Sequence, residues 1–154
     1  MKSTNFTNVQ CFDYKTDLEK IKPGFYKVKN PLHVFKRGYT EAGNVVIINL
    51  VIPTGAVIRT EARRLFTDKI YSKMRASEAY VHSIVRCEVM MMDGIRKTKN
   101  HKQLKHAASW RTSSFKYTVG KMVYPKFPFS FEDRTCDSGI HFFMNSQSAI
   151  NFYG

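Results

Sequence analysis

Three residues near the C-terminal end of the sequence have side chains that nucleophilic catalysis can use: Cys136, Asp137 and His141. A thiolate nucleophile needs a neighbouring base or a positive field, and a histidine can supply the base. The spacing argues against this role, because Cys136 precedes a turn whereas His141 lies inside an apolar strand at residues 140–144. We therefore interpret Cys136 as a structural cysteine and His141 as a core histidine, and we expect no enzymatic activity.

Two further histidines, His101 and His106, have the four-residue separation that occurs in zinc sites. Such sites combine the histidines with a second pair of ligands, and no Cys-x2-Cys pair is present in this sequence. The chain also has no Walker loop, no GxGxxG motif and no paired carboxylates. We therefore expect neither a bound metal nor another cofactor.

The strongest chemical signal is a run of cations without acids between Gly94 and Lys121. These 28 residues hold eight lysines and arginines, and Trp110, Phe115 and Tyr117 are interleaved with them. Cations can follow a phosphate backbone, and an aromatic side chain can stack on an exposed base. A solvated loop that only maintains solubility would rarely lack acids altogether, so we favour binding. The predicted nucleic-acid-binding residues are Arg96, Lys97, Lys99, Lys102, Lys105, Trp110, Arg111, Lys116 and Lys121.

Composition supports a polyanionic partner. The 154 residues include 25 Lys plus Arg against 12 Asp plus Glu, a net charge of +13, which exceeds what solubility requires. Apolar residues make up 43% of the chain, enough for a hydrophobic core and too many for a disordered basic tail. No run approaches the ~20 apolar residues of a membrane span. Three widely spaced cysteines favour a reducing, intracellular compartment.

Two weaker surface signals leave alternatives open. Phe127, Phe129 and Phe131 lie in a Pro-containing connection, so they either mark an exposed interface or fill the core. An interface would favour docking on an acidic protein partner or a homo-oligomer. A second cationic group, diluted by acids, extends the first patch only if it folds back beside it, and is otherwise ordinary surface: Arg59, Arg63, Arg64, Lys69, Lys73 and Arg75.

Short apolar runs punctuated by Gly and Pro predict an α+β domain that is mainly β, with antiparallel sheets and a short C-terminal helix. The clearest strands are residues 25–28, 32–36, 44–52 and 80–92, the last ending at the tight-turn pair Asp93-Gly94. One globular domain is expected over residues 9–154, with a basic insert at about 94–121. A flexible N-terminal arm is expected over residues 1–8.

Other segments are assigned from less regular patterns. Arg37-Gly38 predicts a turn, and Lys99–Ala108 is either a short helix or a flexible loop. Phe115–Tyr124 predicts a pair of strands around a Gly turn. The terminal helix begins at about Ser146, with Asn145 or Ser146 as its N-cap.

Three stretches in this order are VVIINLVIPTGAVI at residues 45–58, KMRASEAYVHSI at residues 73–84, and YTVGKMVYP followed by CDSGIHFFMNSQSAINFY within residues 117–153. They resemble an uncharacterised domain of large DNA viruses (giant viruses) and phages that often accompanies pentapeptide repeats. The resemblance covers about residues 24–154, and its most specific part is the C-terminal CxxGIHFF element. This chain carries none of those repeats, and the basic stretch replaces a shorter, less basic link. The resemblance implies a viral setting and supplies no catalytic residues.

These observations together predict a non-enzymatic, basic viral protein, packaged in the virion with the genome and intracellular in the infected host, in its cytoplasm or nucleus. It would bind nucleic acid, DNA rather than RNA, through sequence-independent phosphate contacts. Contact with ~6–8 phosphates would lower the affinity by roughly three orders of magnitude between 50 and 200 mM salt.

Overall fold

A computed structural model of the chain describes residues 10–12, 23–60, 73–92, 95–109, 115–132 and 137–151. The domain is α+β and mainly β, with antiparallel sheets and one short C-terminal helix, as the sequence predicts. Its elements are β1 (Gln10–Phe12), β2 (Gly24–Val28), β3 (Leu32–Tyr39), β4 (Val45–Ile52), β5 (Val57–Thr60), β6 (Met74–Ala76), β7 (Ala79–Met92), β8 (Ile95–Leu104), β9 (His106–Ala108), β10 (Lys116–Thr118), β11 (Met122–Val123), β12 (Ile140–Phe142) and α2 (Ser146–Asn151).

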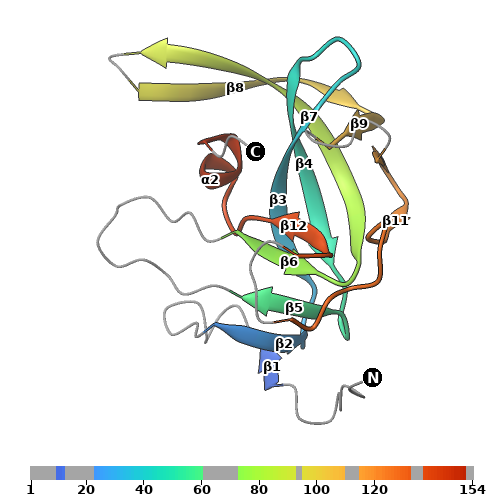
Figure 1. The fold of residues 1–154 in the computed structure, drawn as a ribbon. Coiled ribbons are helices and arrows are strands. Elements are labelled where there is room, and N and C mark those ends of the chain that lie inside the picture. The colour runs from blue at the N-terminus through green and yellow to red at the C-terminus, as the bar shows by residue number, and fades with distance from the viewer. Residues whose placement is uncertain are drawn as a thin grey trace.

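The strands form two sheets, which Figure 1 shows with α2 beside the larger one. The smaller sheet has the strand order β1-β2-β5-β6-β12. The larger sheet has the order β10-β9-β3-β4-β7-β11, with β8 also paired to β7. Except for the parallel pair β1 and β2, the pairings between these strands are antiparallel.

The main hydrophobic core lies between the two sheets, because both contribute buried side chains to one cluster. From the smaller sheet come Ile58 and Phe142, and from the larger come Ile48 and Leu50, all of them fully buried. Burying an aliphatic or aromatic side chain of this size contributes roughly 1.5–3 kcal/mol. A second cluster lies on the opposite face of β4, where α2 packs on Ile47. Because β4 is covered on both faces, its sequence is apolar at every position except Asn49, whose Nδ2 donates to Ser83 Oγ at 3.0 Å.

Several local predictions are confirmed. The apolar run is strand β4, the long strand is β7, and β7 pairs with β8 as an antiparallel hairpin from Met92 and Ile95 onward. The terminal helix begins at Ser146. Its N-cap is Asn145, whose Oδ1 accepts a hydrogen bond of 2.7 Å from the Ser148 N–H.

Three local predictions are wrong. Arg37-Gly38 is no turn but lies inside β3, where a Cβ on Gly38 would come 2.7 Å from Ile48 Cδ1 and 3.0 Å from the Ala108 carbonyl oxygen. Gly38 is thus required for close approach between strands. The Lys99–Ala108 segment, predicted as a helix or loop, forms parts of β8 and β9, because each finds a strand partner in the sheet. The strands β10 and β11 exist but pair with β9 and β7, respectively, and not with each other.

Candidate nucleic-acid interface

Strand β7 is longer than its partner β4, and this leaves a two-stranded extension of the larger sheet. Pairing between β4 and β7 ends at Arg86, whereas pairing between β7 and β8 continues to Met92. Within the described part of the chain, residues 87–92 therefore pair with β8 alone. Figure 1 shows the two strands extending together past the rest of the sheet. We call residues 87–92 and 95–100 the ribbon.

A β-bulge marks the base of the ribbon. Arg86 is opposite Lys102, but Cys87 is opposite Asn100, so His101 is the extra residue on β8. A bulge bends its strand and increases the local twist, and it thereby sets the direction in which the ribbon leaves the sheet. Six residues of strand span about 20 Å.

The ribbon brings together part of the predicted site. Strand β8 carries four of the predicted cations and no acid: Arg96, Lys97, Lys99 and Lys102. The β7 half of the ribbon contains one acid, Glu88, directly opposite Lys99. The described strands of the basic stretch, β8, β9 and β10, are thus part of the larger sheet.

The other predicted residues are farther along the chain. Lys105, Lys116 and Lys121 are exposed on the surface. Lys105 lies between β8 and β9, and Lys116 begins β10. Trp110 and Arg111, the predicted stacking residue and its neighbour, lie outside the described residues.

Main-chain hydrogen bonds hold the turn between β10 and β11 against the larger sheet. The Val119 N–H donates to the Lys105 carbonyl oxygen at 2.9 Å, and the Gly120 N–H donates to the Val81 carbonyl oxygen at 2.8 Å. The Val81 N–H in turn donates to the Lys121 carbonyl oxygen at 3.0 Å. Gly120 has a φ of 86°, a conformation that glycine adopts at low cost. The turn thus fixes the backbone at Lys105 and Lys121.

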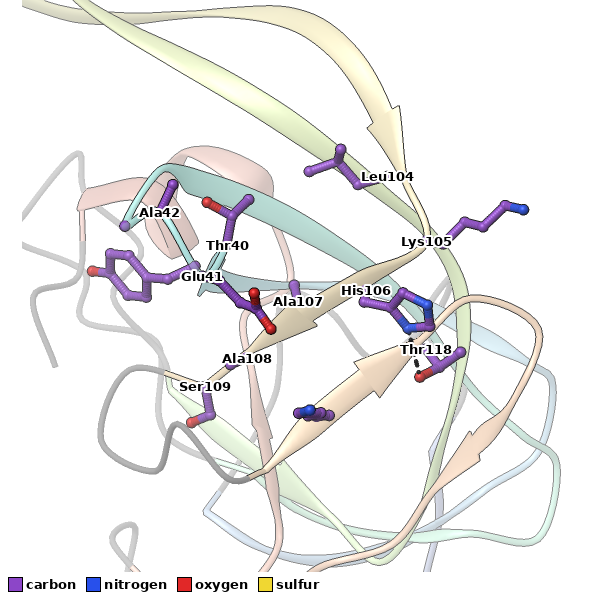
Figure 2. A pocket seen from close by; sticks show the side chains of 13 residues that line it. Thr40, Glu41, Ala42, Leu104, Lys105, His106, Ala107, Ala108, Ser109 and Thr118 are labelled. Atoms are coloured by element: carbon purple, nitrogen blue, oxygen red, sulfur yellow. Dashed lines mark hydrogen bonds between the residues drawn. The ribbon is translucent and has the colours of Figure 1, made fainter.

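A cleft of about 940 Å³ lies where β8 ends. Residues 39–43, at the end of β3 and in the turn that follows it, form one wall, and residues 104–109 with Lys116 and Thr118 form the other. Figure 2 shows the labelled side chains on both sides of this space. Two of the predicted cations, Lys105 and Lys116, therefore line a concave surface.

Strand alternation determines which side chains face the cleft. Lys116 is directly opposite Ala108, and Thr118 is directly opposite His106, so these four residues share one face of the β9–β10 pair. The intervening Ala107 and Tyr117 are buried on the other face, in the main core. The His106 Nδ1 and Thr118 Oγ1 atoms are hydrogen-bonded at 3.2 Å.

The opposite wall is a turn held by its own hydrogen bonds. The Thr40 N–H donates to the Asn44 carbonyl oxygen at 2.9 Å, and the Asn44 N–H donates to Thr40 Oγ1 at 3.1 Å. Gly43 has a φ of 84°, and its N–H donates to the Thr40 carbonyl oxygen at 2.9 Å. This turn positions Glu41 at the cleft, a residue that the sequence analysis did not single out.

The model of a family of unknown function, DUF5758, matches residues 24–149 of this sequence. The chain belongs to the DUF5758 family. The match begins at β2 and ends within α2, so it includes every described strand except β1, and with them the ribbon and the cleft. No curated protein and no solved structure matches the DUF5758 chain significantly.

The described members of the second cationic group on this DUF5758 protein are buried or half-buried and form no surface patch. Arg59 and Arg75 are directly opposite each other on β5 and β6, and they are 5% and 0% exposed. Lys73 is half-buried. The expectation of ordinary surface or of an extended patch is therefore wrong for both arginines. Three members lie outside the described residues: Arg63, Arg64 and Lys69.

Arg75 binds main-chain oxygens of the segment between β11 and β12. Its Nη1 donates to the Ser130 carbonyl oxygen at 2.5 Å and to the Ser138 carbonyl oxygen at 2.9 Å. Its Nη2 donates to the Glu132 carbonyl oxygen at 2.8 Å. The planar guanidinium thus acts as a buried clamp on this connection.

Aromatic rings surround the Arg75 guanidinium. Its central carbon lies 4.9 Å from the Phe129 ring centroid, and Phe129 and Phe131 lie 6.1 and 5.4 Å from Phe25. Phe129 and Phe131 are half-buried, so for these two rings the structure favours the packing alternative over the exposed interface. Phe127 is 66% exposed, and it alone of the three remains available at the surface.

Lys36 is a titratable group that the sequence analysis missed. Its Nζ donates to the His141 carbonyl oxygen at 3.1 Å and lies 5.9 Å from the Tyr117 ring centroid. Burial, and secondarily the charge of Lys73, lowers the pKa of Lys36 to about 8. Burial likewise raises the pKa of Tyr117. Lys36 occupies an inward position of β3. The period-two alternation of that strand, which places Lys36 on the same face as Leu32 and Val34, could therefore have predicted its burial.

Of the residues considered for catalysis, the structure describes Asp137 and His141. Asp137 Oδ1 accepts a hydrogen bond of 2.7 Å from the Ser138 N–H, and Cys136 lies outside the described residues. His141 is half-buried on β12, opposite Arg75. No three His, Cys, Asp or Glu side chains among those described could together hold a metal ion. The helical structure in the described ranges is too short and polar to cross a membrane.

Proposed function

We propose that this DUF5758 protein is a non-enzymatic nucleic-acid-binding protein that contacts phosphates through the ribbon, without reading sequence. The observation that carries the proposal is the basic strand β8, paired with β7 in an extension beyond β4. The major groove of DNA is ≈ 12 Å wide and admits a two-stranded β-ribbon. Cations along such a ribbon would lie near the phosphates on both sides of the groove.

The charge distribution supports the same proposal. The net charge of +13 attracts polyanions over distance, and it speeds encounter at low salt. Lys105, Lys116 and Lys121 are exposed and continue the cationic surface beyond the end of β8. We propose DNA as the partner in preference to RNA, because the major groove of an RNA helix is too narrow and deep for a ribbon.

A salt-titrated binding assay tests the proposal on the full chain. Fluorescence anisotropy would follow a duplex DNA, a single-stranded DNA and an RNA in parallel. The ribbon variant replaces Arg96, Lys97 and Lys99 with glutamine. Because each phosphate contact contributes about 0.9 to the slope of log affinity against log salt, we expect the duplex slope to fall in magnitude by two to three.

A matched control separates the ribbon from the net charge. Lys27, Lys29 and Lys126 are exposed lysines outside the ribbon and the cleft, and replacing them with glutamine removes the same charge. We expect the duplex slope of this control to stay near that of the natural sequence. Equal losses in both variants, or binding that is insensitive to salt, would contradict the proposal. If the β8 cations only prevent edge-to-edge pairing, the ribbon variant would aggregate yet bind with an unchanged slope.

We further propose a viral setting for this protein, within the virion of a large DNA virus and inside the infected host cell. The support is the resemblance of the RASEAYV, YTVGKMV and CDSGIHFF stretches to the domain of giant viruses and phages. A sequence-independent DNA-binding surface suits packaging with a genome, because phosphate contacts are available at every site. Mass spectrometry of purified virions would detect the chain if this is correct, and its absence there would contradict the proposed location.

A second candidate function is docking on an acidic protein partner or a second copy of the chain. The observation that favours it is the pair of exposed aromatic side chains Tyr124 and Phe127, which are 60% and 66% exposed. Light scattering distinguishes the two functions, since a strict monomer that still shifts DNA in a gel favours the first. A dimer that the Phe127→Ser substitution dissociates would favour the second.

A further inference from the structure

The cleft combines apolar walls with a small number of polar groups. Its volume of about 940 Å³ lies within the range of small-molecule sites, which are mostly apolar with a few placed donors and acceptors. Ala42 on the turn, Leu104 at the end of β8 and Ala108 on β9 provide apolar surface. A flat aromatic ligand would lose water from both faces between such walls.

One side of the cleft presents hydrogen-bond donors to an anion. Lys116, Thr118 and His106 share the outward face of β9 and β10, and all three line the cleft. Lys116 supplies an ammonium. His106 and Thr118 are hydrogen-bonded to each other, so this pair leaves one donor for a ligand, either the imidazole Nε2–H or the hydroxyl. The ammonium and this donor lie on one face and suit a phosphate. In Figure 2 the Lys105 side chain extends away from the turn that forms the opposite wall, so we leave Lys105 out of this set.

The other side presents an acceptor. Glu41 is the single acid among the residues that line the cleft, and it is exposed. In Figure 2 its side chain points from the turn toward β9. A carboxylate accepts two parallel hydrogen bonds. Among the common bases, guanine alone offers two adjacent donors, N1–H and the 2-amino group, on its Watson–Crick edge. A carboxylate beside a phosphate-binding set therefore favours guanine over a bare phosphate.

We propose that this cleft is a binding site for a guanine nucleotide. Glu41 accepts the two donors of the base, the apolar walls cover its faces, and Lys116 with His106 and Thr118 binds the phosphate. This proposal rests on the proposed nucleic-acid-binding function, and it adds a site that would recognise one kind of base. The recognised group is shared by a free guanine nucleotide and a guanine in a single strand.

Calorimetric titration of the full chain with GMP and IMP tests the proposal, because IMP lacks only the 2-amino group. We expect GMP to bind about tenfold more tightly than IMP, in line with the discrimination that a bidentate contact provides. Equal affinities for GMP and IMP would overturn the proposal. An oligonucleotide with a single guanine, compared with its hypoxanthine analogue, shows whether the cleft also takes guanine from a strand. If the oligonucleotide with guanine also binds more tightly than its hypoxanthine analogue, the cleft accepts a guanine within a strand. If only GMP shows the preference, the ligand is the free nucleotide.

Variants at exposed positions separate the two sides of the site. Glu41→Gln should abolish the preference for GMP over IMP. Lys116→Gln should instead lower the affinity for GMP and for IMP by the same factor. Lys126→Gln is the matched control, since Lys126 is exposed, does not line the cleft and lies outside the cationic surface. If Glu41 merely repelled the phosphate, Glu41→Gln would strengthen the binding of both nucleotides, and that result would refute its role.

The same variants distinguish this proposal from the ribbon proposal. Glu41→Gln should leave the salt slope of duplex binding unchanged, and the ribbon variant should keep the GMP preference. If the natural protein does not bind duplex DNA but prefers GMP over IMP, the ribbon proposal is wrong and the cleft proposal stands. If it binds duplex DNA but shows no preference for GMP over IMP, the cleft proposal is wrong and the ribbon proposal stands.

Discussion

Replacing the buried Arg75 should destabilise the fold more than any surface change of the same type. Arg75 is 0% exposed and donates to the carbonyl oxygens of Ser130, Glu132 and Ser138. Arg75→Met keeps the apolar stem but removes all three donors. Arg75→Lys keeps the charge, but a single ammonium lacks the planar fork that reaches separate acceptors.

The magnitude follows from these contacts. A buried acceptor that loses its donor costs about 1–3 kcal/mol, and the low end applies at the exposed Glu132, where water can replace the donor. The Ser138 oxygen keeps a second donor, the Ser130 N–H at 3.3 Å, so two acceptors bear most of the loss. Loss of the cation–π contact with Phe129 adds about 0.5–2 kcal/mol. We expect Arg75→Met to lower the free energy of unfolding by about 3–5 kcal/mol, after the gain from no longer burying a charge. Arg75→Lys should cause a smaller loss, because its ammonium keeps the charge and can still donate to part of the acceptor set.

Guanidinium chloride unfolding, followed by the intrinsic fluorescence and by circular dichroism, measures this change. The control is Arg86→Lys, at an exposed position of β7, which should change the stability by less than about 0.5 kcal/mol. A loss below about 1 kcal/mol for Arg75→Met would show that the clamp contributes little and would refute the reasoning. Full rescue by Arg75→Lys would show that charge, and not the fork geometry, is what the site needs.

Three further predictions concern stability. The lowered pKa of Lys36 means that the unfolded chain binds more protons between about pH 8 and 10.5, so stability should rise with pH through that window. Unfolding titrations from pH 7 to 9.5 should show this rise in the natural sequence and lose it in Lys36→Met; an unchanged rise would exclude Lys36 as its source. Gly38→Ala should cost about 1–3 kcal/mol, because the added methyl would come 2.7 Å from a β4 side chain and 3.0 Å from a β9 carbonyl oxygen. Gly24→Ala, whose methyl makes only an ordinary contact at 3.6 Å, should cost less in the same melts. Asn145→Ala should cost about 1 kcal/mol through loss of the helix cap, and Ser146→Ala should have little effect; equal losses would contradict the assignment of the cap.

Much of the fold could be predicted where a signal is local. The apolar run of β4, the alternation of β7 with its tight-turn pair, and the capped terminal helix each depend on neighbours within a few residues. The prediction of a turn at Arg37-Gly38 was wrong, because a glycine can serve either of two purposes: a turn, or a close approach between strands. At Gly38 the close approach involves Ile48 and Ala108, which are distant in sequence and therefore give no local signal.

The candidate site could be predicted in part. A run of cations without acids marked β8, since composition is visible without structure. That these cations lie on a two-stranded extension required knowing where pairing with β4 ends, at Arg86. The cleft required the β3–β4 turn to face β9 and β10, so Glu41 and Thr118 carried no local signal.

By itself the sequence determined the mainly β class, the principal strands, the capped helix and the concentration of positive charge, because propensity, alternation and composition are properties of short stretches. Only the tertiary structure decided the surroundings of the described cations. Arg75 is a buried clamp, Lys36 is a buried amine with a lowered pKa, and Lys116 lines a cleft. Identical charges acquire different roles because strand pairing, which joins residues far apart in the chain, decides which of them water can reach.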